Sequence, residues 1–111
     1  MSVKTQHPVT VLYRGDLHDT ATIVGLVQSN IRIGVIAYTG SLGKKNLENI
    51  KSLNRWLEQK SQPLVSIHPH LTLQQLEQVI VSPLSGWGWG QDECKTAINL
   101  SGIKFIQNNE F

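Results

Sequence analysis

Residues 19–30 read Asp-Thr-Ala-Thr-Ile-Val-Gly-Leu-Val-Gln-Ser-Asn, and the state of this stretch decides the fold. Its apolar positions are Ile23, Val24, Leu26 and Val27. They fit one face of a helix that Asp19 is placed to cap. The β-branched residues and Gly25 weaken a helix, and as a strand the stretch would turn into a hairpin at Ser29-Asn30. We predict a helix over residues 20–28.

The two runs that flank this stretch are predicted strands. Residues 9–13 are β-branched and aromatic, and Pro8 stands at their entrance, where its missing N–H does least harm. Residues 31–38 are almost continuously apolar, with Arg32 as their only charge. A run of this kind indicates a strand that is buried on both faces, as in the middle of a sheet covered by helices.

Residues 44–59 carry the clearest helical pattern, because their apolar residues recur at spacings of three and four. These residues are Leu47, Ile50, Leu53 and Leu57. Residues 64–67 form a short strand candidate. Thr72 and Gln75 make a capping box, with Leu71 and Leu76 as the matching hydrophobic staple. This signal predicts a second helix, which runs to about residue 81 and ends at Ser82-Pro83.

The last third of the chain is less regular. Residues 82–91 contain Gly-Trp-Gly-Trp-Gly, which predicts a loop or a glycine-loosened strand. Residues 92–100 are expected to form a short helix with Cys94 facing inward. Residues 102–106 alternate in polarity and are predicted to be a final strand at a sheet edge.

Strands that alternate with helices predict an α/β domain with a small, mainly parallel sheet of three to four strands, flanked by helices. The alternative is an α+β domain with an N-terminal antiparallel meander, which follows if residues 20–28 are a strand. We expect residues 1–8 to be a flexible lead and residues 9–111 to form a single globular domain, since 111 residues is a common domain size.

Composition limits the classes of function. Charged residues make up 16% of the chain, below the typical ~25%, so a partner or a second copy is expected to cover part of the surface. The net charge of +2 comes from scattered basic residues, which disfavours nucleic acid as a partner. Cys94 is the only cysteine, and neither a signal-peptide pattern nor an apolar run long enough for a bilayer is present. These features predict a cytoplasmic protein that is not bound to a membrane.

The strongest candidate site is the loop of residues 39–45, which precedes the best predicted helix. Backbone N–H groups at a helix N-terminus favour anions, glycines allow close approach, and two lysines add charge. The spacing of the glycines matches neither a P-loop nor a dinucleotide fingerprint. The residues expected to bind an anionic or nucleotide-like ligand are Gly40, Ser41, Gly43, Lys44 and Lys45.

A second candidate combines carboxylates with imidazoles. Asp16 and His18 follow the first strand, and His68 and His70 follow the third, so they could form a metal site or an acid–base site. The simpler interpretation gives Asp16 to a turn and the histidines to a Pro-containing turn. Cys94 has acidic neighbours, which do not favour a reactive thiolate.

Parallel strands would bring all these loops to one edge of the sheet, where open α/β sheets bind ligands. The sequence therefore favours a small non-catalytic binding module, a homo-oligomer or a partner of another protein. The alternatives are a metal-dependent hydrolase or phosphoesterase using His68, His70, Asp16 and His18, and an interaction module using Trp87 and Trp89. The sequence leaves the identity of any cofactor open.

Overall fold

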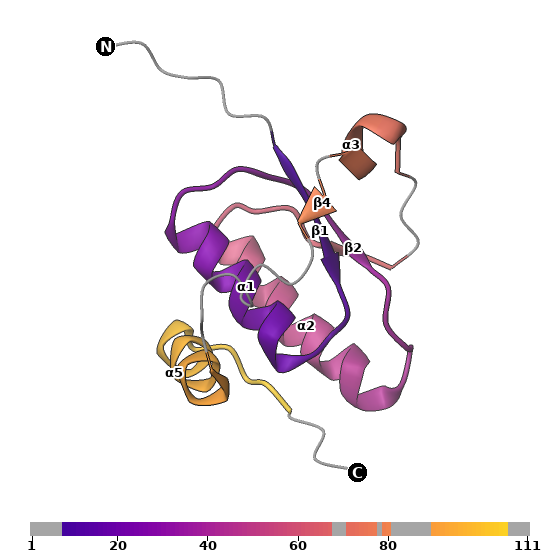
Figure 1. The fold of residues 1–111 in the computed structure, drawn as a ribbon. Coiled ribbons are helices and arrows are strands. Elements are labelled where there is room, and N and C mark those ends of the chain that lie inside the picture. Colours follow the sequence, from indigo (N-terminus) through magenta and orange to yellow (C-terminus); the bar gives the residue numbers. More distant parts are fainter. Residues whose placement is uncertain (1–7, 68–70, 78, 81–89, 107–111) are drawn as a thin grey trace, which may run out of the picture.

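The fold is an α/β domain built on one parallel sheet. The computed structural model describes residues 8–67, 71–77, 79–80 and 90–106 (Figure 1). In chain order the elements are β1 (Val9–Tyr13), α1 (Leu17–Gln28), β2 (Ile33–Tyr38), α2 (Lys44–Gln59), β3 (Val65–Ser66), α3 (Leu73–Glu77), β4 (Val79–Ile80) and α5 (Gln91–Ser101). The strand order is β3-β2-β1-β4, and each neighbouring pair is parallel. The predicted parallel α/β sheet is confirmed, and the alternative antiparallel meander is wrong.

The stretch that decides the fold is helical, and it forms α1. The cap is Asp16, whose Oδ1 accepts from Asp19 N at 2.8 Å, so the helix begins three residues earlier than we predicted. At the other end Asn30 has a φ of 60°, and Ile31 N donates to Leu26 O at 3.0 Å. This is a Schellman ending, so Ser29-Asn30 terminates a helix instead of turning a hairpin.

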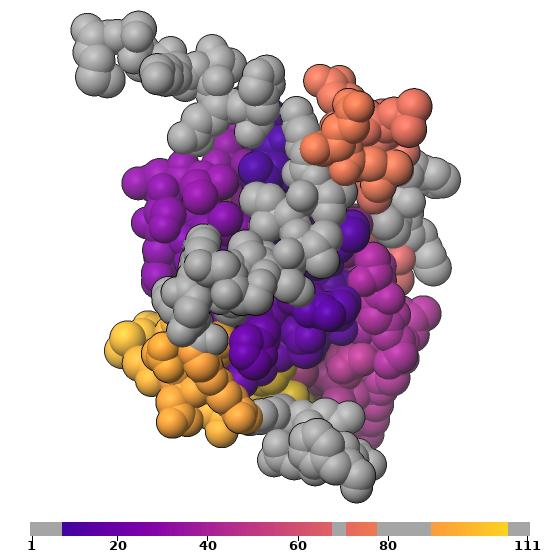
Figure 2. Space-filling view, viewed as in Figure 1, coloured from indigo at the N-terminus to yellow at the C-terminus, as the bar shows by residue number. Residues whose placement is uncertain are grey.

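Tertiary packing outweighs the weak helix propensity of α1. Its buried residues are Leu17, Asp19, Thr20, Ala21, Thr22, Ile23, Val24, Gly25 and Leu26. The helix lies among the sheet, α2 and α5, and Figure 2 shows α5, in orange, directly against it. Because nearly every turn of α1 is covered, burial of apolar surface stabilises β-branched residues that would disfavour an isolated helix.

The register of β1 and β2 divides the sheet residues between two faces. Val11 lies opposite Ile36, and Tyr13 lies opposite Tyr38; all four side chains belong to the core shared with the helices. Leu12 is half-buried on the other face. Right-handed crossovers in this strand order place α1 and α2 on one face and the β3-to-β4 connection on the other. Within the described ranges, no helix is long and apolar enough to cross a bilayer.

The helix predicted up to residue 81 is wrong in its second half. Its capping box forms as expected, with Gln75 N donating to Thr72 Oγ1 at 3.1 Å and Thr72 N donating to Gln75 Oε1 at 2.8 Å. However, α3 ends at Glu77, and Val79–Ile80 form β4. The two residues pair with β1 on the side away from β2. The backbone hydrogen bonds of this pairing therefore replace those of a continued, exposed helix.

The strand predicted over residues 102–106 is also wrong. Ile103 is buried and Phe105 packs against the core, so the alternation reflects contact with helices and no sheet pairing. The segment is fixed by Asn49 of α2, a buried residue. Its Oδ1 accepts from Ile106 N at 2.6 Å, and its Nδ2 donates to Ile106 O at 2.8 Å.

We predict that Asn49→Ala lowers the free energy of unfolding by about 1–3 kcal/mol, because both hydrogen bonds to Ile106 are lost inside the protein. The C-terminal segment should then open locally, and trypsin should cleave after Lys104 faster than in the wild type. Asn99→Ala, at an exposed position of α5, is the control. Equal cleavage rates after Lys104 in the three proteins would contradict this account.

Candidate functional site

The candidate site lies where the strand order reverses. Strands β2 and β3 extend to one side of β1, and β4 lies on the other side. Open parallel sheets bind ligands at the carboxyl ends of their strands near such a reversal. The loops after β1 (residues 14–16) and after β2 (residues 39–43) meet at this edge, where Thr39 N donates to Tyr13 O at 2.8 Å. The convergence of these two loops, which the sequence predicts for a parallel sheet, is present.

Gly40 and Tyr38 hold the two loops together. A Cβ at Gly40 would overlap the carbonyl oxygen of Arg14 and lie 2.7 Å from Tyr38 Oη, so only glycine fits between the loops. The Tyr38 hydroxyl donates to Ser41 O, and Asn46 Nδ2 donates to Ser41 Oγ at 2.9 Å. A tyrosine phenol is protonated near neutral pH, and burial raises the pKa of Tyr38 further, so the hydroxyl acts as the donor. The path of the loop before α2 is thereby fixed.

The N-terminus of α2 carries positive charge without a local counter-charge from its first turn. Its N-cap, Gly43, offers no side-chain hydrogen bond, and the first turn holds no acidic residue. Lys44 and Lys45 are exposed there, and no salt bridge within the described residues involves Lys44. The helix dipole adds to this positive potential.

The other two long helices differ in this respect. The first turn of α1 contains Asp19 and its cap is Asp16, while α5 has Asp92 and Glu93 in its first turn. Carboxylates at these positions offset the positive end of a helix. Of these three helices, α2 is therefore the one whose N-terminus attracts an anion.

The carboxylates after β1 serve the fold. Asp19 is only 2% exposed, and it accepts from Arg14 Nε at 2.9 Å, Arg14 Nη2 at 3.0 Å and Arg14 N at 2.9 Å. These hydrogen bonds raise the pKa of Arg14. Asp16 caps α1, and His18 is exposed on the first turn of α1. The hydrogen bond from Asp19 N to Asp16 Oδ1 therefore supports a structural role for Asp16.

The metal hypothesis stays a prediction. It needs His68 and His70, which lie outside the described residues. Among residues 8–67, 71–77, 79–80 and 90–106, no group of three or more His, Cys, Asp or Glu side chains is arranged to hold a metal ion.

Cys94 is buried beneath α1 and keeps its proton. Burial raises the pKa of its thiol, and the nearby carboxylates of Glu93 and Asp16 raise it further. Because the thiolate is the nucleophilic form, this environment suits a structural cysteine.

A hollow of about 460 Å³ runs along α2 from the same loop. It is mostly apolar, and it begins at Lys44, so it adjoins the positive N-terminus of the helix. Its lining residues are Leu42, Lys44, Leu47, Glu48, Ile50, Lys51, Asn54 and Ile67. Ile67 directly follows β3, which places the hollow at the carboxyl edge of the sheet.

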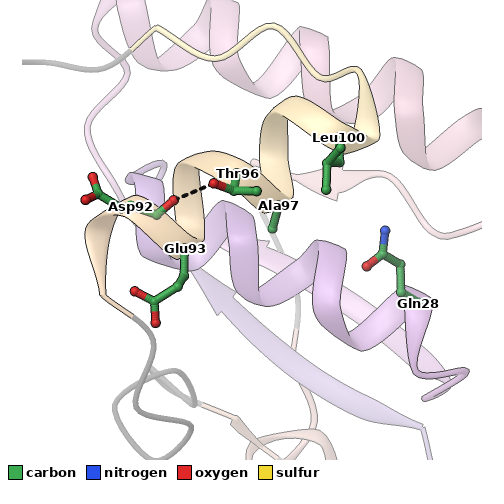
Figure 3. Close-up of a pocket in the computed structure, with 6 residues that line it drawn as sticks. All are labelled: Gln28, Asp92, Glu93, Thr96, Ala97 and Leu100. Atoms are coloured by element: carbon green, nitrogen blue, oxygen red, sulfur yellow. Dashed lines mark hydrogen bonds between the residues drawn. The ribbon is translucent and has the colours of Figure 1, made fainter.

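A second hollow of similar volume, about 460 Å³, lies between α1 and α5 (Figure 3). Gln28 of α1 stands at one end and the carboxylates of Asp92 and Glu93 stand at the other, while Leu100 is 81% exposed. Two carboxylates make this hollow unsuited to an anion. Trp87 and Trp89, the predicted interface residues, lie outside the described residues.

Comparison with models of protein families, with curated proteins and with solved structures finds no match to the chain.

Sequence reasoning did not single out four residues that shape this edge. Tyr38 and Leu42 read as core and loop residues, because nothing in the pattern shows that the Tyr38 ring separates two loops. Asn46 and Asn54 lie on polar positions of the α2 pattern, where solvent exposure is the ordinary expectation. A polar residue in the first turn of a helix after a glycine-rich loop is the one signal that could have identified Asn46.

We predict that Gly40→Ala lowers the free energy of unfolding by about 1–3 kcal/mol, because the added Cβ forces the loops after β1 and β2 apart. Gly43→Ser is the control, since space is open there, with the nearest atom, Ser41 Oγ, 3.7 Å from a built Cβ. Serine also suits an N-cap. Chemical denaturation measures both variants. A Gly40→Ala protein as stable as the wild type would show that the two loops are not in contact.

Proposed function

We propose that this chain is a small non-catalytic module that binds an anionic, nucleotide-like ligand at the carboxyl edge of its parallel sheet. The observation that carries the proposal is the reversal of strand order at β1, which brings the loops after β1 and β2 together at the end of the sheet where such folds bind ligands. The glycine–lysine loop of residues 39–45 is the binding element.

Electrostatics supports an anion at this loop. Lys44 and Lys45 provide charge, and the first turn of α2 provides backbone N–H groups without a capping side chain. The carboxylates near the neighbouring loop are engaged in structural contacts, because Asp19 is enclosed by Arg14 and Asp16 caps α1. They therefore do not compete with an anion for the donors of α2. An approaching phosphate would therefore meet lysines and amide donors first.

The chemistry of the same groups supports binding over catalysis. Tyr38, Ser41 and Asn46 satisfy one another by hydrogen bonds and fix the loop. Lysine side chains and backbone amides hold an anion by charge and hydrogen bonding without transferring a proton. The hydrolase, the interface of Trp87 and Trp89, the homo-oligomer and the cytoplasmic location stay predictions.

A thermal-shift panel of pyrophosphate and nucleoside mono-, di- and triphosphates tests the proposal, with affinities then measured by calorimetry. Wild-type protein should be stabilised by at least one member. Gly43→Asp should lose at least tenfold in affinity, because a carboxylate at the cap takes the N–H groups and repels the anion. The variant itself should be at least as stable as the wild type without ligand, since aspartate is a good N-cap.

Gly90→Asp is the matched control, because Gly90 is also an N-cap without a side-chain hydrogen bond, at the start of α5. Its affinity should stay within twofold of the wild type. The proposal fails if no member of the panel stabilises the wild type, or if Gly43→Asp binds as tightly as the wild type.

A further inference from the structure

The hollow along α2, called the α2 groove from here on, has the size and lining of a small-molecule site. Its volume of about 460 Å³ lies within the roughly 300–1,000 Å³ of ligand pockets. Leu42, Leu47, Ile50 and Ile67 supply apolar surface. Leu42, which belongs to the lysine loop, is 53% exposed, so the described residues do not fully cover this large apolar side chain. A ligand that fills this hollow must present an apolar surface to it.

Asn54 supplies one oriented hydrogen-bond donor in this apolar lining. Its Oδ1 accepts from Val65 N of β3 at 2.8 Å, which fixes the orientation of the amide. The Nδ2 group is a donor by the same assignment, and no described residue accepts from it. A fixed donor in an apolar groove selects ligands that carry an acceptor on a flat apolar body.

The charges along the groove indicate where a negative group would lie. Lys44 lines the groove at its end by the loop, whereas Lys51 is balanced by Glu48, with Nζ 3.6 Å from Oε2. Positive charge is therefore concentrated at the Lys44 end, and the Asn54 end is polar without net charge. Lys44 and Asn54 are ten positions apart in α2, which corresponds to ~15 Å at the rise of an α-helix. A phosphate and a ring joined by a sugar match this separation of charge and apolar surface.

We infer that the ligand of this edge is a nucleotide whose base lies in the α2 groove against Leu42 and Ile67, accepts from Asn54 Nδ2, and extends its phosphates to Lys44. This inference rests on the proposed function, and it adds the class of ligand and the residues that select it. Bare phosphate anions satisfy the lysine loop but leave the groove empty. The base must then contribute affinity that pyrophosphate lacks.

Calorimetric titration of the full chain with ADP, GDP and pyrophosphate tests the inference, with the ratio of nucleotide to pyrophosphate affinity as the readout. At least one nucleotide should bind at least tenfold tighter than pyrophosphate. Asn54→Asp keeps the acceptor for Val65 N and replaces the donor by an oxygen. Its added charge weakens both probes alike, so the ratio isolates the donor, and it should fall at least fivefold.

Leu42→Ala should lower the same ratio several-fold, because the inferred arrangement packs Leu42 on the base. Any effect of the variant on the path of the lysine loop acts on both probes and cancels in the ratio. Leu100→Ala is the matched control, since it removes an exposed leucine from the other hollow and should leave the ratio unaltered. Circular dichroism confirms that each variant is folded before titration.

The outcomes separate the two proposals. If pyrophosphate binds as tightly as both nucleotides, or if the ratio is unchanged in Asn54→Asp and Leu42→Ala, the anion site stands and the inference is overturned. If neither pyrophosphate nor nucleotide binds, the proposed function fails and the inference with it. A dimer in light scattering that Leu42→Ala dissociates would assign the groove to a second copy and would also overturn the inference.

Discussion

The contact between the loops after β1 and β2 is the constraint on which the candidate site depends. Gly40 lies against the backbone carbonyl of Arg14, Thr39 N donates to Tyr13 O, and the Tyr38 ring fills the remaining space. A parallel sheet without this contact would still have its carboxyl edge, but the loop before α2 would have no fixed path. The contact fixes the position of the first turn of α2, and it thereby places Lys44 and the end of the α2 groove that adjoins it.

The sheet was predictable because its central elements have strong local signals. The run of residues 31–38 is apolar except for Arg32, and α2 begins and ends at the residues that the leucine spacing indicates. The state of α1 was the harder case, since its β-branched residues favour a strand. Asp16 at its start and Asn30 at its end supply the helix signals, and burial supplies the stability that propensity lacks.

The errors arose where local pattern and long-range pairing disagree. Val79 and Ile80 continue the apolar spacing of the helix that Thr72 caps. They form a strand because the edge of β1 is available to pair with them. Ile103 and Phe105 alternate like a strand, yet helices cover them and Asn49 takes the backbone groups of Ile106. The same limit applies to the site, where the loop of residues 39–45 was visible and the roles of Tyr38 and Asn54 were not. The Tyr38 ring lies against Tyr13 and Gly15, and Asn54 accepts from Val65 of β3, so both roles depend on contacts that exist only in the folded sheet.

The position of bound ligand on the fold tests the central claim most directly. Titration of ¹⁵N-labelled protein with ADP, followed by the chemical shifts of backbone amides, reports that position residue by residue. The account predicts shifts concentrated in residues 40–47 and 14–16, with a further set near Asn54 and Ile67 and little change along α5. Shifts confined to the hollow between α1 and α5, or no shifts at all with ADP and the other phosphates, would contradict it.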